Sequence, residues 1–186
     1  SKNGKTFGLL INPLDHAVNS LSVGTIERYL EALEIFKALR LPLLTVTDTP
    51  GGDPRQKNSD MNVIMKTLSL IKSLVDYPFD KVGLIAGRCF GGSGLLSLPV
   101  VHGSLGLYAT RNSKIGAISD EFIEKLAKAN PEHYKEWKQS QASHAADLAD
   151  LLQTGNLSGL IDWPEISSFI ERFLKLQLLV LSYLQK

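Results

Sequence analysis

The chain has 186 residues, of which 44% are hydrophobic and 21% are charged, so it carries enough apolar sequence to bury one sizeable core. Its 20 basic and 19 acidic side chains give a formal charge of +1, a balance without the basic excess of a nucleic-acid-binding protein. The single cysteine, Cys89, excludes an internal disulfide framework, cannot form a structural zinc site by itself, and favours the reducing cytoplasm.

Hydrophobic periodicity predicts alternating strands and helices. Between residues 23 and 39, apolar side chains recur every three or four positions with charged residues between them, which is typical of a helix with one buried face. Short apolar runs predict strands at residues 5–11, 43–47, 81–86, 105–109 and 114–118. Further helices are predicted at residues 61–75, 120–128 and 145–152, and after Pro164. This alternation predicts an α/β fold with a largely parallel sheet and right-handed crossovers.

The C-terminal portion, from about residue 120 to 186, is predicted to be mainly helical. Its last apolar stretch, residues 169–184, is interrupted by Glu171, Arg172 and Lys175, which favours an amphipathic helix over a membrane span. Apolar residues lie on more than one face of this helix. Such a helix is either wrapped by its own domain or docked on a partner.

Two glycine-containing loops follow predicted strands. The first reads Asp48-Thr49-Pro50-Gly51-Gly52, and the second runs from Gly87 through Gly91-Gly92 to Ser93. Ligands of open α/β sheets bind near the carboxyl ends of strands, where both loops begin. Adjacent glycines let the backbone approach a ligand closely, and the free N–H groups of a helix start attract anions. Gly92 and Ser93 are therefore the candidate amide donors of an oxyanion hole. A tight strand-to-helix junction without a ligand is the alternative.

Other reactive side chains fit known catalytic patterns less well. Cys89 follows an apolar strand and is expected to be a small buried hydrophobe rather than a nucleophile. Ser93 lacks the glycine two positions later that a nucleophile elbow needs, because residue 95 is leucine. The four histidines show no metal-ligand spacing, so we expect no metal site.

Three ordered segments carry a family resemblance: residues 41–44 leading into 48–51, residues 88–93, and residues 151–162. Together they resemble the carboxyltransferase subunits of biotin-dependent acyl-CoA carboxylases, and in particular the half that faces biotin. Residues 4–6 and 114–117 fall in the expected order, so the resemblance extends over most of the chain. It implies the crotonase fold, a spiral of ββα units, as a single domain over residues 1–186.

The resemblance also implies a mechanism. The amides of Gly92 and Ser93, with Gly91 before them, would stabilise the enolate-like oxygen of biotin's ureido group as carboxybiotin loses its carboxyl. Such donors are worth on the order of 3 kcal/mol each in other oxyanion holes. Biotin's nitrogen would then take the α-proton of the acyl-CoA, so no protein side chain serves as base. The residues expected to line the substrate or cofactor site are Asp48, Thr49, Pro50, Gly51, Gly52, Arg88 and Phe90.

The family pattern differs from this chain at three positions. Cys89, Phe90 and Ser93 stand where the family usually has a small residue, a tyrosine and an alanine. A site formed by backbone amides tolerates these changes. The family enzymes also use a second, similar half to bind CoA, which implies a second crotonase-like subunit or domain, a biotinylated carrier protein and an oligomer. No nucleic-acid or membrane partner is implied.

Two other functions remain open at this stage. The related malonate decarboxylase subunits use the same fold, and the same amides could stabilise the enolate formed when a malonyl-type thioester loses its carboxyl without biotin. Alternatively, the chain could be a non-catalytic crotonase-like assembly partner. The glycine loop contains no obvious acid, base or nucleophile, which fits both a scaffold and catalysis by backbone amides alone.

Overall fold

A computed structural model describes residues 6–11, 22–51, 61–91, 104–117, 119–129, 131–136, 138–139 and 145–184. The predicted α/β class and largely parallel sheet are confirmed. Five strands form a parallel sheet in the order β1-β2-β3-β4-β7. Their bounds are Gly8–Ile11 (β1), Leu43–Thr49 (β2), Lys81–Phe90 (β3), Ser104–Thr110 (β4) and Gly159–Ile161 (β7).

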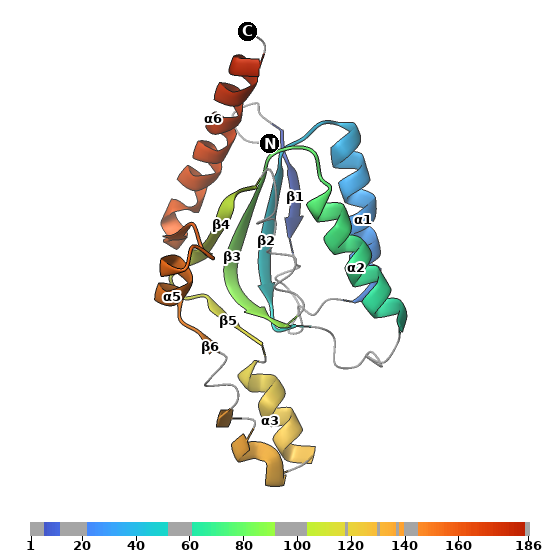
Figure 1. Ribbon diagram of the computed structural model, residues 1–186, viewed down its shortest axis with the longest axis vertical. Coiled ribbons are helices and arrows are strands. Elements are labelled where there is room, and N and C mark those ends of the chain that lie inside the picture. The colour runs from blue at the N-terminus through green and yellow to red at the C-terminus, as the bar shows by residue number, and fades with distance from the viewer. Residues whose placement is uncertain are drawn as a thin grey trace.

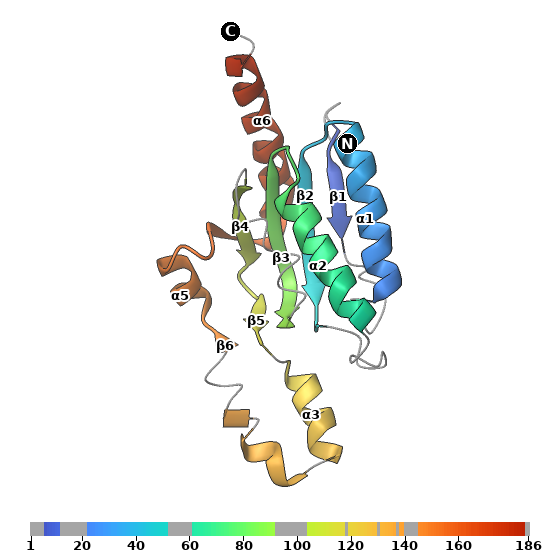
Figure 2. The same cartoon turned by 45° about the vertical axis from the view of Figure 1, so that its right-hand side comes forward.

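Helices cover both faces of this sheet (Figures 1 and 2). Helices α1 (Val23–Ala38) and α2 (Met61–Val75) pack on one face, while α6 (Ile166–Leu184) crosses the other. Successive side chains of β2 point to opposite faces of the sheet. Leu43 lies in the core under α1 and α2, and Leu44 lies in the core under α6. Helix α3 (Asp120–Ala129) lies beyond the carboxyl ends of the strands.

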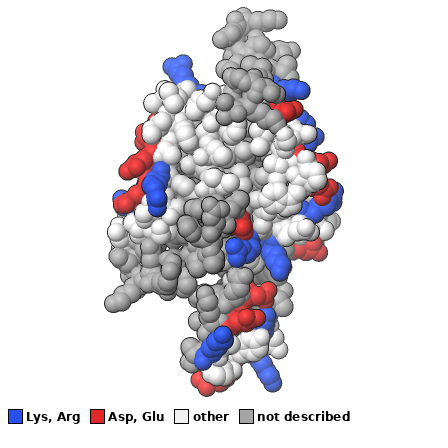
Figure 3. Space-filling view, turned by 180° about the vertical axis from the view of Figure 1, so that it is seen from behind, with Lys and Arg blue, Asp and Glu red and all other residues white. Residues whose placement is uncertain are grey.

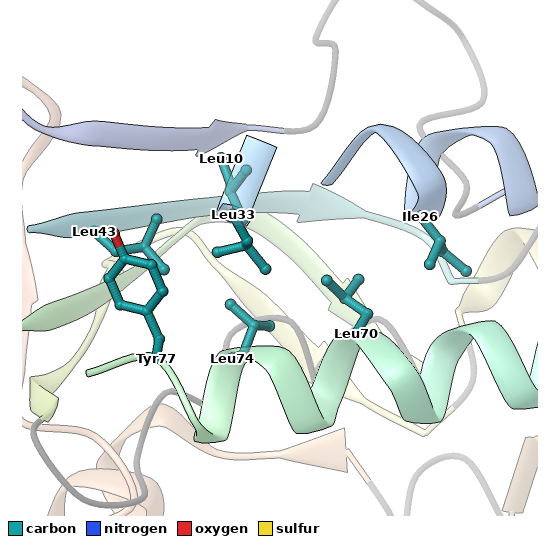
Figure 4. Close-up of a cluster of buried hydrophobic side chains, with 7 residues drawn as sticks. All are labelled: Leu10, Ile26, Leu33, Leu43, Leu70, Leu74 and Tyr77. Atoms are coloured by element: carbon teal, nitrogen blue, oxygen red, sulfur yellow. The ribbon is translucent and has the colours of Figure 1, made fainter. Parts of the chain in front are cut away.

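The core beneath α1 and α2 shows why these helices form (Figure 4). Ile26 and Leu33, two turns apart on α1, are 0% and 1% exposed, as the periodicity predicts. The complete cluster consists of Leu10, Ile26, Leu33, Leu43, Leu70, Leu74 and Tyr77. Ser22 caps the start of α1, because its hydroxyl accepts a hydrogen bond from the Thr25 amide at 3.2 Å.

A buried lysine caps the C-terminal end of α2. Lys81 begins β3 and is 0% exposed, and its Nζ donates hydrogen bonds to the carbonyls of Leu74 (2.6 Å) and Val75 (2.9 Å). These carbonyls have no partner within their own helix, so the ammonium satisfies acceptors that would otherwise be buried and unpaired. Burial lowers the pKa of Lys81, and the nearby Asp76 carboxylate partly opposes that shift.

Strand β3 changes neighbours halfway along its length. Its first half pairs with β4 as far as Ile85, and its last three residues pair with β5 (Lys114–Gly116). At the change, Ser113 Oγ donates to the Ile85 carbonyl at 2.9 Å and Thr110 Oγ1 donates to the Ala86 carbonyl at 3.2 Å. These hydroxyls replace the missing strand partner, so β3 continues toward the sheet's carboxyl edge.

The remaining elements refine the predicted boundaries. The strand expected at residues 81–86 extends to Phe90, and the strand expected at 43–47 extends to Thr49. The helix expected at 145–152 is wrong in its first residues, because Ala145–Ala146 form β6, which pairs antiparallel with β5, and α5 spans Leu148–Gln153. Short 3-10 helices occupy Pro131–His133 (η2) and Trp163–Glu165 (η3).

Candidate functional site

The two predicted glycine loops begin side by side at the carboxyl edge of the sheet. Thr49 at the end of β2 pairs with Cys89 near the end of β3, after a shift in register that begins beyond Thr47. Of the predicted site residues, Asp48, Thr49, Pro50, Gly51, Arg88, Phe90 and Gly91 are described. Gly52, Gly92 and Ser93 lie outside the described residues.

Asp48 and Arg88 join the two strand ends. Asp48 Oδ1 accepts hydrogen bonds from the backbone amide of Arg88 at 2.8 Å and from its Nε at 3.2 Å. The side chains are 23% and 30% exposed, so the ion pair is partly shielded from water. This contact holds β2 against the last residues of β3, which lead to Gly91.

Gly87 makes the contact possible, and it was not among the predicted site residues. A Cβ at this position would lie 2.7 Å from Asp48 Oδ1 and 2.9 Å from its Cγ, closer than atoms pack. Any larger residue would therefore push the carboxylate away from Arg88. The available signal was a glycine directly before a charged residue at the end of an apolar strand.

A tight turn follows β2 and lies against the end of β3. The buried Thr49 hydroxyl donates to the Gly51 carbonyl at 3.2 Å and accepts from the Gly51 amide at 3.3 Å. Gly51 has a φ of +123°, and a Cβ there would lie 3.4 Å from the Phe90 carbonyl oxygen. The backbone conformation therefore requires glycine here, and the turn lies within van der Waals contact of the end of β3.

Gly91 turns the chain at the end of β3. Its φ of +60° lies in the left-handed region, and a Cβ would sit 3.4 Å from the Ala117 carbonyl oxygen, just after β5. The side chains before it are buried, with Phe90 8% and Cys89 2% exposed. Cys89 packs in an apolar cluster with Ile85 and Leu107, which confirms its prediction as a small buried hydrophobe.

The described surface carries mixed charge. Figure 3 shows acidic and basic side chains interspersed over the face that it presents. Within the described ranges, no three His, Cys, Asp or Glu side chains are grouped as metal ligands would be. No helix in the described part of the chain is both long and apolar enough to cross a membrane.

No family model matches the sequence. The chain is 23% identical over 145 residues to a Bacillus subtilis (strain 168) protein described as a propionyl-CoA carboxylase beta chain, and the match covers 75% of this chain and 29% of that protein. The chain therefore spans less than a third of its curated relative.

Solved structures show the fold. The transcarboxylase 12S structure, a hexamer with methylmalonyl-CoA bound, matches with a TM-score of 0.69 and 16% identity over 93% of this chain and 35% of that one. The Pseudomonas aeruginosa geranyl-CoA carboxylase beta subunit matches with a TM-score of 0.70 and 16% identity, over 92% and 34%. An enoyl-CoA hydratase/isomerase family protein from Silicibacter pomeroyi matches with a TM-score of 0.64 and 12% identity, over 89% and 76%.

Proposed function

We propose that this chain, which is homologous to a propionyl-CoA carboxylase beta chain and shares the crotonase-like fold of carboxyltransferase subunits, is the biotin-facing component of an acyl-CoA carboxyltransferase. Residues 1–186 would form a single carboxyltransferase domain that acts in the cytoplasm. Its substrates would be a carrier-bound carboxybiotin and an acyl-CoA thioester.

The closeness of the first residues of the two glycine loops at the sheet's carboxyl edge is the observation that supports this function most. Gly91 adopts a left-handed φ at the end of β3, with Gly92 and Ser93 next in the sequence, and the turn that contains Gly51 lies against the Phe90 carbonyl. Ligands of parallel sheets bind at this edge. A site that acts through backbone N–H groups requires glycines where the backbone must be exposed, and this edge has them.

Biotin is proposed here because its chemistry matches the amide donors that this edge would present. Its ureido oxygen is a hydrogen-bond acceptor, and the amides of Gly92 and Ser93 are the donors that would hold it. Carboxybiotin, when bound, supplies the carboxyl group to be transferred. The chain's own contribution is to present donors at an oxygen that gains negative charge during the reaction, where such donors lower the barrier most.

Asp48 and Arg88 would act as positioning residues. Their contact sets the course of β3 three residues before Gly91, with Asp48 Oδ1 holding both the backbone amide and the side chain of Arg88. A donor displaced by even 1 Å loses much of its effect on a transition state. Thr49 and Gly51 support the same edge from β2, and Pro50 and Gly52 would line it.

A second crotonase-like subunit or domain would complete the site. The matched carboxylases are about three times as long as the matched region, because the chain covers 35% of the transcarboxylase 12S chain and 34% of the geranyl-CoA carboxylase beta subunit. The partner half would bind CoA and hold the acyl carbonyl. Transcarboxylase 12S assembles as a hexamer, and we propose an oligomer for this chain as well.

Purification of the untagged protein from its native host tests this proposal. Co-elution with a biotinylated protein, detected with streptavidin, and with a second crotonase-like chain, identified by mass spectrometry, is the expected result. A biotin-free homo-oligomer that decarboxylates malonyl-type thioesters would replace this function with the decarboxylase alternative. A homo-oligomer without either activity would favour the assembly-partner alternative.

A further inference from the structure

A cavity of about 260 Å³ lies between helix α6 and strands β4 and β7, away from the candidate site. It touches β3 only at Val82, nine positions before Gly91, which is about 30 Å along an extended strand. The residues around it are Val82, Leu105, Tyr108, Leu160, Ile161, Glu165, Phe169, Arg172 and Phe173.

The walls of the cavity are aromatic and well packed. The rings of Tyr108 and Phe169 meet edge to face with their centroids 4.8 Å apart. Gly159 also packs close to Tyr108, since a Cβ at this position would lie 3.3 Å from the ring. Phe169 and Phe173 are only 7% and 3% exposed, because they pack on the sheet. The cavity therefore has a fixed apolar floor.

Two opposite charges stand at its rim. Glu165 and Arg172 are seven positions apart, about two helical turns or 10 Å along the axis. Glu165 is engaged locally, since its Oε2 accepts a hydrogen bond from the Asp162 amide at 3.3 Å. Arg172 is exposed, and no hydrogen bond or ion pair holds it within the described part of the chain. An anionic ligand would therefore be attracted at the Arg172 end and repelled at the other.

We propose that this cavity binds a small monocarboxylate with an apolar body, placed with its carboxylate on Arg172. The size limits the ligand, because a protein cavity of about 150 Å³ holds one benzene ring. A cavity of 260 Å³ therefore accommodates an arylpropionate or a straight chain of about eight carbons. Arg172 binds the carboxylate, and the rings of Tyr108 and Phe169 on the cavity floor contact the apolar body. This inference does not depend on the proposed carboxyltransferase function.

Calorimetric titration of the purified protein with octanoate and with its neutral analogue octanamide tests the proposal. For about ten heavy atoms we expect octanoate to bind one site with a dissociation constant of about 0.1 to 1 mM. Octanamide should bind about tenfold more weakly, because it lacks the charge. Arg172→Gln should weaken octanoate binding about tenfold and remove the difference between the two ligands.

Lys175→Gln is the matched control, since it removes the same charge from an exposed position of α6 outside the cavity. It should leave both affinities unchanged. Leu105→Trp, which fills the cavity, should abolish binding of both ligands. Non-saturating binding, equal affinities for octanoate and octanamide, or equal effects of the Arg172 and Lys175 substitutions would overturn the proposal. Unaltered binding to the Leu105→Trp protein would place the ligand elsewhere and overturn it too.

Discussion

Replacement of Asp48 by alanine tests the contact that joins the two strand ends. The change removes an acceptor of two hydrogen bonds, at 2.8 Å from the Arg88 amide and 3.2 Å from its Nε. A hydrogen bond to a charged group contributes about 1.5 to 3 kcal/mol when shielded, and less where water reaches it. With the pair 23% and 30% exposed, we expect the free energy of unfolding to fall by about 2 kcal/mol.

Urea unfolding followed by circular dichroism measures this loss, and an unchanged slope against urea shows that the folded state is otherwise intact. Asp48→Asn keeps an acceptor and should lose less than half as much. The control is Glu34→Ala, which removes an exposed carboxylate 3.1 Å from Lys37 and should change stability by less than about 0.5 kcal/mol. Equal effects of Asp48→Ala and Glu34→Ala would refute the reasoning.

Three further features of the fold can be tested by substitution. Gly106→Ala should lower the free energy of unfolding in urea by more than about 2 kcal/mol, because its Cβ would lie 2.4 Å from Ser158 Oγ. Gly155→Ala is the control: its Cβ would meet nothing within 4 Å, so it should lower the free energy of unfolding by only the roughly 1 kcal/mol of a left-handed φ. Lys81→Met leaves the last carbonyls of α2 unpaired and should cost about 2 to 3 kcal/mol in the same assay. Burial raises the pKa of Tyr77 to about 12, above the ordinary value of 10, so the stability it contributes is present below pH 10 and is lost as pH rises toward 12. Tyr77→Phe should therefore flatten the fall in unfolding free energy over this range, and an unaltered slope would contradict that assignment.

The parallel sheet could be predicted from the sequence because its central strands, β2 and β3, are buried on both faces. Strands such as 43–47 and 105–109 are short runs rich in apolar and β-branched or aromatic residues, separated by helical periodicity, and these patterns indicate the α/β class. The apolar residues on more than one face of α6 also follow from this architecture. Phe169 and Phe173 face the β4 and β7 side, while Ile166 and Ile170 line an apolar groove toward β1 and β2.

The strand ends could not be predicted, because long-range contacts determine them. Gly87 and Arg88 read locally as a loop, yet they continue β3 because Arg88 and its neighbours pair with β5. The hydroxyls of Thr110 and Ser113 that bridge this change lie more than 20 positions away in sequence. The role of Gly87 likewise depends on Asp48, 39 positions earlier, so the local pattern marks the glycine but not its partner.

The proximity of the two glycine loops is a different case. The rule that parallel strands end at one edge accounts for it, since Thr49 at the start of the first loop pairs with Cys89 just before the second. The roles of Gly92 and Ser93 as amide donors remain predictions, because both lie outside the described residues.

Carboxyl exchange tests the central claim most directly. The assembly purified from the native host is incubated with carboxyl-labelled malonyl-CoA or methylmalonyl-CoA, with and without free biotin, and loss of label from the thioester is measured. We expect loss that depends on biotin, at least about tenfold slower in Gly91→Ala, because the altered turn displaces the amides that follow it. Gly155→Ala, a left-handed glycine far from the site in sequence, should retain the normal rate. Loss of label that persists when avidin blocks both free and carrier-bound biotin, or equal rates in the two variants, would contradict the account.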